Sequence, residues 1–363
     1  LLQARSLWWK IFLPPLIWIS LAYIFSFTPT ESFWAHFGQP QPLYLLQIIS
    51  ITGLAGLTFL IVSLNSIISS FIINAEKKRI PIAAGTIIAV IVLIIAVYGA
   101  INVQEDVTGE ISVAVVQPNF PDSMEWRKEH ADEIFDTYEK LILDAGEADI
   151  IVLPLYTLPV EFNAFLRKFE NFSRMSNAYI AVGNYRGNTN VALLFSNEGK
   201  LIGEYEAIHK PPFRNQTAGN EYVVMNTGLG RLGLLSCYDT VGEKITREFA
   251  RKDSQLLVSM ANDNRFFGTT ELQQHFEIDI LRAVQSKRYI VRAVPSGISS
   301  IINPFGSVLE RSEIGKQQIL FGKVKAIGEQ TMFTRFGDIL SPFSLLVIIA
   351  YIIREKIPFA EKK

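Results

Sequence analysis

The sequence has 363 residues and is almost neutral, with 34 Lys and Arg against 35 Asp and Glu. This balance excludes a strongly basic nucleic-acid-binding protein and an acidic disordered chain. A single cysteine excludes an intramolecular disulfide framework and a zinc site built on several thiolates.

The charged residues are distributed unevenly along the chain. Residues 1–104 contain only seven of them, whereas the rest of the sequence has the charge density of a water-soluble domain. A helix needs about 20 apolar residues to cross a bilayer. We therefore predict transmembrane helices in residues 1–104 and one more, followed by a cytoplasmic tail, in residues 336–363. The apolar stretches are residues 11–27, 43–73, 80–102 and 340–353.

Basic residues predict the orientation of these helices. Lys77, Lys78 and Arg79 lie between the second and third apolar stretches, and Arg354 and Lys356 follow the last one. The positive-inside rule places such clusters in the cytoplasm, so the segment between the third and last stretches is expected outside. The first and last stretches are short, and buried core helices are the alternative for these two. No small-residue cleavage site follows the first stretch, so we do not expect a cleavable signal peptide.

Residues 105–335 have the pattern of a soluble α/β domain. Short apolar runs typical of strands alternate with amphipathic helical patterns, and the turn at residues 196–199 predicts a hairpin. The predicted strands are residues 111–117, 150–153, 179–182, 191–195, 201–205, 232–236, 255–258, 289–293, 299–302 and 319–324, and the predicted helices are residues 126–143, 162–175 and 271–284. This order indicates a domain with a mixed β-sheet.

Two motifs in this domain have simple structural explanations. Residues 228–233 match the G-x-G-x-x-G spacing of dinucleotide-binding loops, but a predicted strand follows where a helix is needed, so we interpret them as a turn between strands. His275 and Asp279 lie one helical turn apart, but two ligands do not make a metal site. We therefore expect neither a cofactor nor a metal.

Cys237 is the strongest candidate for a reactive side chain. It follows the predicted strand 232–236 and precedes Tyr238 and Asp239, where the strand gives way to a loop or helix. Cysteine is usually a small buried hydrophobe, so position alone does not make it catalytic.

Short stretches along the chain match the sequence pattern of a known family, and one of these stretches contains Cys237. In chain order these are Phe37-Gly38-Gln39, Thr52-Gly53, Leu64-Asn65, Val113–Asn119, Asn190–Phe195, Gly199, Tyr205, Gly233–Tyr238, Asn262-Asp263, Phe267-Gly268, Arg282-Ala283, Arg292, Gly297, Ser299, Pro304 and Gly306. In order and spacing they resemble the apolipoprotein N-acyltransferases, the membrane branch of the nitrilase (carbon–nitrogen hydrolase) superfamily.

The resemblance implies a four-layer α-β-β-α sandwich on the outer face of a bacterial cytoplasmic membrane, in a multi-pass and monomeric protein. It also implies an activity, in which a cysteine takes an acyl chain from a phospholipid as a thioester and passes it to the N-terminal amine of a lipoprotein. The expected partners are therefore phospholipid, lipoprotein and the membrane, with no nucleic acid. A soluble amidase is disfavoured by the apolar stretches.

The sequence departs from the family at the positions that carry its chemistry. The family's general-base glutamate aligns with Leu155, and its oxyanion-stabilising lysine aligns with Ala207. The family's Cys-Tyr-Glu is Cys237-Tyr238-Asp239 here. The glutamate that ends the family's lysine segment is Asn215 here. Together with Asn262, the residues Tyr238, Asp239 and Asn215 are expected to line the pocket.

Two charged residues could substitute for the missing groups. Lys210 replaces the family lysine only if the alignment slips, which loses the match at Pro212 and Phe213. Glu161 lies six residues beyond Leu155 and is expected on the next helix. Two hypotheses follow: an N-acyltransferase-like enzyme that uses Cys237, or a catalytically inactive relative that binds lipid, lipoprotein or a partner enzyme.

Overall fold

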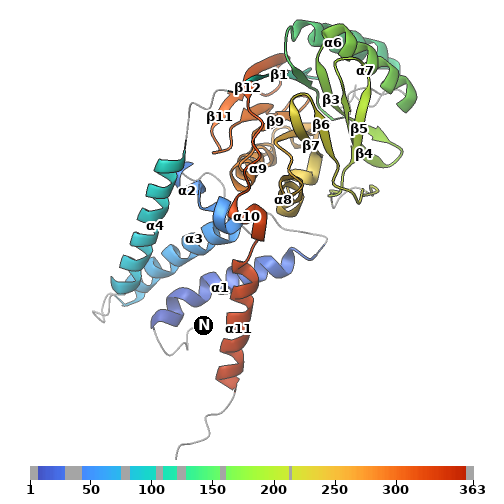
Figure 1. Cartoon of the computed structure of the whole chain (residues 1–363). Coiled ribbons are helices and arrows are strands. Elements are labelled where there is room, and N and C mark those ends of the chain that lie inside the picture. The colour runs from blue at the N-terminus through green and yellow to red at the C-terminus, as the bar shows by residue number, and fades with distance from the viewer. Residues whose placement is uncertain are drawn as a thin grey trace, which may run out of the picture. The chain divides into compact units, whose positions relative to one another are not determined.

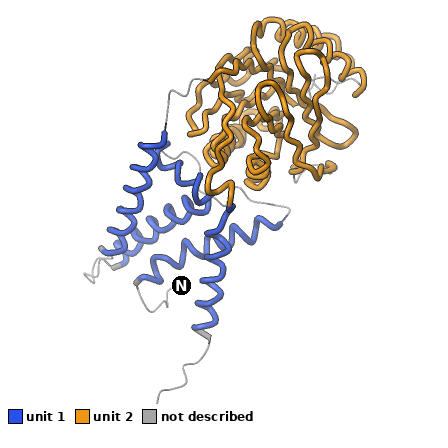
Figure 2. Tube along the Cα trace, viewed as in Figure 1, with its two compact units in different colours: residues 1–103, 336–363 blue, residues 104–335 orange. Residues whose placement is uncertain are grey.

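The computed structural model describes residues 7–28, 43–74, 82–103, 109–120, 128–155, 161–211 and 215–356 (Figure 1). The chain forms two compact units (Figure 2). One contains residues 1–103 and 336–363, and the other contains residues 104–335.

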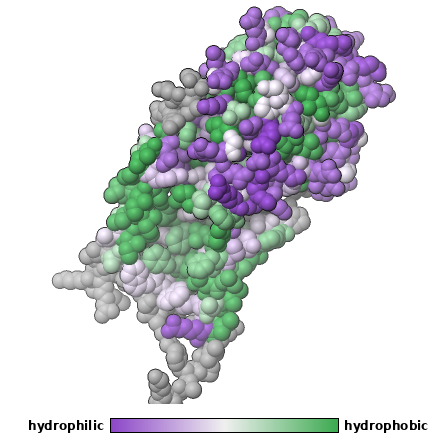
Figure 3. Space-filling model, viewed as in Figure 1, coloured by the Kyte–Doolittle hydropathy of each residue, from purple (hydrophilic) through white to green (hydrophobic). Residues whose placement is uncertain are grey.

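The first unit is helical. Three of its described helices are long and apolar enough to cross a membrane, with candidate spans at Trp8–Phe25, Ile49–Ile73 and Ala83–Asn102. Hydrophobic residues cover this unit in Figure 3, whereas hydrophilic residues predominate on the other. Its helices are α1 (Leu7–Phe25), α2 (Leu43–Leu46), α3 (Ile49–Asn74), α4 (Ile82–Asn102) and α11 (Leu340–Lys356).

The structure corrects the predicted stretch 43–73, which is not one continuous helix. It is divided between α2 and α3, and α3 itself is kinked at Gly53, whose φ of 67° lies in the left-handed region. Glycine adopts this region without a Cβ clash, so the kink is permitted where the hydropathy pattern shows nothing. A second glycine, Gly99, allows close packing, because a Cβ on it would lie 2.0 Å from the Tyr44 carbonyl oxygen.

The second unit is a sandwich of two six-stranded sheets. The first sheet has the order β12-β1-β2-β3-β4-β5, with β1 at Ile111–Gln117, β2 at Ile150–Val152, β3 at Tyr179–Arg186, β4 at Thr189–Phe195, β5 at Leu201–Glu206 and β12 at Gln318–Val324. The second has the order β11-β10-β9-β8-β7-β6, with β6 at Val224–Thr227, β7 at Gly230–Ser236, β8 at Leu256–Met260, β9 at Ile290–Ala293, β10 at Ser300–Ile302 and β11 at Val308–Arg311.

Helices cover the outer faces of this sandwich. Helices α6 (Ala131–Asp144) and α7 (Phe162–Ser176) pack on the first sheet, and α8 (Glu243–Arg251) and α9 (Thr270–Ser286) pack on the second. A short helix, α10 (Met332–Phe336), precedes α11. These layers confirm the expected α-β-β-α sandwich. Of the predicted helix 126–143, the start at Trp126 lies outside the described residues.

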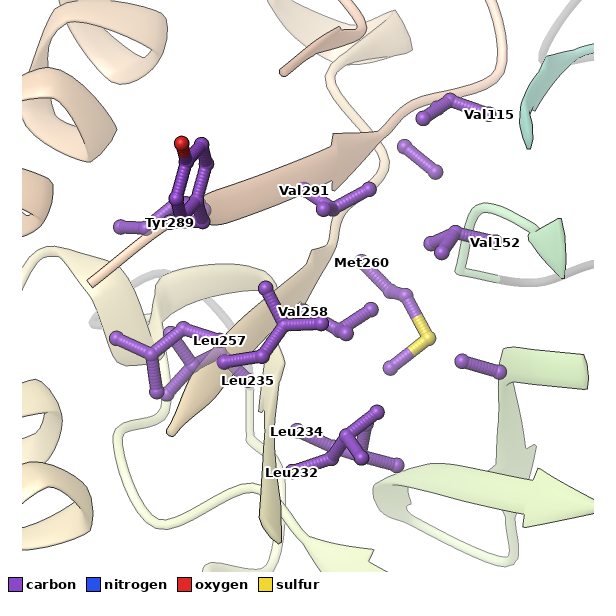
Figure 4. Close-up of a cluster of buried hydrophobic side chains, with 14 of the residues drawn as sticks. Val115, Val152, Leu232, Leu234, Leu235, Leu257, Val258, Met260, Tyr289 and Val291 are labelled. Atoms are coloured by element: carbon purple, nitrogen blue, oxygen red, sulfur yellow. The ribbon is translucent and has the colours of Figure 1, made fainter. Parts of the chain in front are cut away.

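The alternation of β1 explains how one strand serves two cores. Val113 and Val115 belong to the cluster between the sheets, where Val115 lies opposite Val291 in Figure 4. Ala114 and Val116 belong to the cluster under α6 and α7. Because successive side chains point to opposite faces of a strand, a strand buried on both faces is a continuous apolar run.

Two predicted turns are confirmed by the strand pairing. The hairpin at residues 196–199 joins β4 to β5, and Gly199 has a φ of 80°. Residues 228–229 connect β6 to β7, which pair in antiparallel fashion from Thr227 opposite Gly230. The glycine-rich motif is therefore a strand connection and not the start of a nucleotide-binding helix.

Candidate functional site

The candidate site lies where four strands end. Ala207 directly follows β5, Cys237 directly follows β7, and Leu155 and Asn262 follow β2 and β8 by a few residues. The strands β2, β3 and β5 run in the same direction, as do β7 and β8. Carboxyl ends of parallel strands meet at one edge of a sheet, and this edge is the common location of binding sites in α/β domains.

Two contacts bring these strand ends together across the two sheets. The backbone N–H of Leu155 donates to the carbonyl of Ala261 over 3.4 Å. Because Ser236 lies opposite Met260 in the β7–β8 register, Ala261 and Cys237 are the next residues on neighbouring strands. The structure therefore places Leu155 beside the strand that neighbours the one carrying Cys237.

Asp239 makes the second contact. One carboxylate oxygen accepts from the backbone N–H groups of Ile208 at 3.1 Å and His209 at 2.9 Å, and the other accepts from the N–H of Ser236 at 2.9 Å. The segment after Ala207 is thereby fixed to the turn that contains Cys237. Both oxygens accept hydrogen bonds, so we interpret this fully buried carboxylate as a structural link between the two segments and not as a base.

Burial is the main influence on Asp239. It raises the pKa of Asp239 to about 7, although the amides of His209, Ser236 and Ile208 and the Tyr205 hydroxyl lower it. A carboxyl that titrates near neutral pH is common at functional sites, but structural networks perturb pKa values as well.

Cys237 occupies an unusual backbone conformation. Its φ of 53° lies in the left-handed region, which costs a non-glycine residue on the order of 1 kcal/mol. It begins a short 3-10 helix, Cys237–Thr240, and its side chain is partly exposed. A sharp strand-to-helix turn of this kind is the way several hydrolases present their nucleophile.

The two positions that the resemblance assigns to acid–base chemistry hold packed apolar side chains. Leu155 is completely buried, and a Cβ placed on Gly183 of β3 would lie 2.7 Å from its Cδ1. Ala207 is also buried, and its backbone bonds to Asn190 at 2.9 Å and to Gly219 at 2.8 Å. Neither position holds an ionisable group.

The expected substitutes are on the surface. Lys210 and Glu161 are both exposed, and so is Asn215, which was expected to line the pocket. Glu161 lies not on α7 but directly before it, as the N-cap residue. Pro212 and Phe213 lie outside the described residues, so a role for Lys210 remains a prediction. Asn262 is half-buried, and its Oδ1 accepts from the N–H of Asn264 at 3.1 Å, which shapes the loop after β8.

His209 is a residue of the site that the sequence pattern does not indicate. Its ring meets the ring of Tyr238 edge-on at 5.3 Å between centroids, and a Cβ on Gly242 would lie 2.7 Å from its Nδ1. Burial and then the charge of Arg282 lower the pKa of His209 to about 4. The imidazole is therefore neutral at pH 7 and a weak base.

The pair His275 and Asp279 is part of a buried ion network. His275 Nδ1 lies 2.7 Å from Asp263 Oδ1, and Arg292 donates to Asp263 at 2.6 Å and to Asp279 at 2.7 Å. Burial would raise the pKa of Asp263, but the charges of His275 and Arg292 lower it. Among the described residues, no group of three or more His, Cys, Asp or Glu side chains could hold a metal.

Comparisons with known proteins support the family and the fold. The carbon–nitrogen hydrolase family model matches residues 112–328. The apolipoprotein N-acyltransferase of Geobacter metallireducens is 27% identical, and the match covers 90% of this chain and 70% of that protein. The corresponding protein of Thermotoga maritima is 25% identical, with 89% and 64% covered.

Solved structures show the same fold at low sequence identity. An amidase from Nesterenkonia sp. has a TM-score of 0.51 and 16% identity, and the match covers 62% of this chain and 95% of the amidase. The NitFhit protein of C. elegans has a TM-score of 0.50 and 19% identity, with 69% and 66% covered.

Proposed function

Because the chain belongs to the carbon–nitrogen hydrolase family, and within it is similar to apolipoprotein N-acyltransferases, we propose that it binds phospholipid and lipoprotein at the Cys237 site without efficient acyl transfer. One observation carries this proposal: Leu155 and Ala207 pack as apolar residues where the resemblance implies a base and a cation. The likeness to the relatives over about nine-tenths of the chain supports the ligand class.

Acyl transfer makes two demands that this site meets poorly. The thiol of Cys237 must lose a proton as its sulfur forms a bond to the acyl carbonyl carbon, and that proton must reach the departing lysophospholipid oxygen. The tetrahedral intermediate also needs a cation or hydrogen-bond donors for its oxyanion. His209 is a weak base and Asp239 already accepts several donors. Losing one member of a catalytic group removes most of its rate.

The conformation of Cys237 favours a second candidate function, a slow but active N-acyltransferase. A left-handed, partly exposed cysteine at a strand end is costly, and binding a ligand does not require it. Three candidate membrane spans precede the sandwich in the chain and would hold it near lipid, which gives proximity.

Mass spectrometry separates the two candidates. The full chain would be incubated with phosphatidylethanolamine vesicles and its intact mass measured, with Cys237→Ser as the control. We expect no acyl adduct, together with retained binding of a diacylated lipopeptide. An adduct that Cys237→Ser abolishes supports the active enzyme, and loss of lipopeptide binding contradicts the proposed ligand class.

The cellular setting is part of the proposal. We propose a monomer in the bacterial cytoplasmic membrane, crossing it several times, with residues 105–335 on the extracytoplasmic side. The basic residues around 77–79 and after 353 support this orientation. In a Cys237→Ser background, Lys200→Cys on the exposed β4–β5 turn should react with a membrane-impermeant maleimide on intact cells. Protection from the maleimide would place the sandwich in the cytoplasm.

A further inference from the structure

One buried arginine donates hydrogen bonds to the turn that carries Cys237. Arg282, on α9, is completely buried. Its Nε donates to the carbonyl of Thr240 at 2.7 Å, and its Nη2 donates to the carbonyl of Val241 at 2.7 Å. These two carbonyls close the 3-10 turn that begins at Cys237. The guanidinium is thus hydrogen-bonded to the last residues of the turn, and the thiol is on its first residue.

The remaining contacts of Arg282 fix its orientation and partly balance its charge. Its Nη1 donates to the Gln285 side chain and lies 3.5 Å from Glu243 Oε1. Gln285 in turn donates to the same Glu243 oxygen at 2.6 Å. Glu243 is about a quarter exposed and begins α8 directly after the turn. The arrangement is a planar fork with two backbone carbonyls on one side and an amide and a carboxylate on the other.

The charge of Arg282 also affects the pKa of a residue in the site. It contributes to the lowered pKa of His209, whose ring contacts Tyr238 next to Cys237. The titratable groups around the turn are Tyr238 and Asp239 within it, Tyr205 on β5, which bonds to Asp239, His209 after β5, His275 on α9, whose ring lies 6.5 Å from that of Tyr238, and Glu243 on α8. Arg282 is completely buried, and its bonds to the carbonyls of Thr240 and Val241 place its charge beside the turn that begins at Cys237, whereas the family's lysine position holds Ala207.

We infer that Arg282 is a positioning residue of the Cys237 site, which holds the turn in its left-handed conformation and favours the thiolate. The inference requires Cys237 to be the centre of the site but does not require acyl transfer to proceed. The experiment below therefore uses an artificial electrophile, so that its outcome is independent of the proposed function.

The single cysteine makes the test specific, because iodoacetamide labelling of the full chain reports on Cys237 alone. The labelling rate would be measured against pH in Arg282→Met, Arg282→Lys and the unaltered chain. Loss of a nearby buried cation should raise the pH midpoint by about one unit, or about tenfold slower labelling at pH 7. Arg282→Lys should restore most of the midpoint because it keeps the charge.

Arg288→Met is the matched control. Arg288 is equally buried two residues beyond the end of α9, but its guanidinium donates to the carbonyl of Ser254, away from the Cys237 turn. We expect it to lower stability without moving the pH midpoint. An unchanged midpoint in folded Arg282→Met, or an equal shift in Arg288→Met, would overturn the inference.

A milder variant keeps the test decisive if Arg282→Met does not fold. Glu243→Gln removes the carboxylate beside Arg282 and leaves an oxygen for Gln285 to bond. The less neutralised guanidinium should lower the pH midpoint and speed labelling at pH 7 about twofold to threefold. A midpoint that is unchanged or raised would count against the inference.

Discussion

The two sheets contribute differently to the same site. The second sheet and its helices supply Cys237 in its left-handed turn, the carboxylate of Asp239 and the buried guanidinium of Arg282. The first sheet supplies Leu155 and Ala207, which are buried and apolar. The turn that carries the thiol is therefore held by polar contacts, whereas the two positions expected to carry a base and a cation hold apolar side chains. The comparison teaches that one sheet can hold a thiol in a constrained turn while the other contributes only apolar side chains at the neighbouring strand ends.

The largest expected effect is on stability, in the ion network behind the second sheet. Arg292→Met leaves Asp263 and Asp279 buried without their common cation. Breaking a buried pair from one side costs about 3–5 kcal/mol, so the free energy of unfolding in detergent should fall by this amount. The double variant Arg292→Met with Asp263→Asn should recover part of the loss. A single variant as stable as the parent would show that this network does not support the site.

Restoring the ionisable groups on the first sheet should produce the next largest effect. Leu155→Glu combined with Ala207→Lys places a carboxylate and an ammonium at the two strand ends. General acid–base catalysis typically contributes about 100-fold or more, and we expect a gain of this order in acylation of Cys237 by phospholipid vesicles.

The matched control for this gain is Leu155→Gln with Ala207→Met, which adds similar volume without charge. Thermal unfolding of both double variants would establish that each is folded. If the charged pair gives no more adduct than the neutral pair, the first sheet lacks more than these two groups.

The last prediction concerns the pH dependence of stability. Asp239 has a pKa raised to about 7 in the folded chain, against about 3.9 when unfolded. The folded state therefore keeps a proton that the unfolded state has lost, and this stabilisation, complete below about pH 4, decreases as the pH rises through 7. His209 acts in the opposite sense, because its folded pKa is lowered to about 4.

The difference in unfolding free energy between the parent chain and Asp239→Asn isolates the carboxyl from the other titrating groups. Measured at several pH values between 4 and 8, it should fall as the pH rises. A difference that stays constant as the pH rises from about 5 to 8 would mean that Asp239 is ionised throughout this range.

The sequence predicts the strands and turns of the α/β domain well because their signals are local, whereas the four-layer sandwich was implied only by the resemblance. Alternation in β1, the turn at residues 196–199 and the strand before Cys237 all depend on neighbours within a few positions. The polar contacts of the site were not predictable in this way. Arg282 lies 42 residues from Thr240, and His209 reaches Asp239 from 30 residues away. Such contacts depend on how strands order in the sheets, which periodicity does not specify.

The helical unit shows a different limit. No charged residue interrupts residues 43–73, so neither the break between α2 and α3 nor the kink at Gly53 is marked by charge. Both depend on backbone conformation, which a glycine permits but does not require.

The acylation state of Cys237 in the full chain, isolated from its own membrane, tests the central claim most directly. Intact mass spectrometry would read this state without added substrate. Because Leu155 and Ala207 are apolar where the resemblance implies a base and a cation, Cys237 should be recovered unacylated, with the unmodified mass. A mass increased by one fatty acyl group and restored by hydroxylamine, which cleaves thioesters, would show that the site performs the first half of the reaction and would contradict the account.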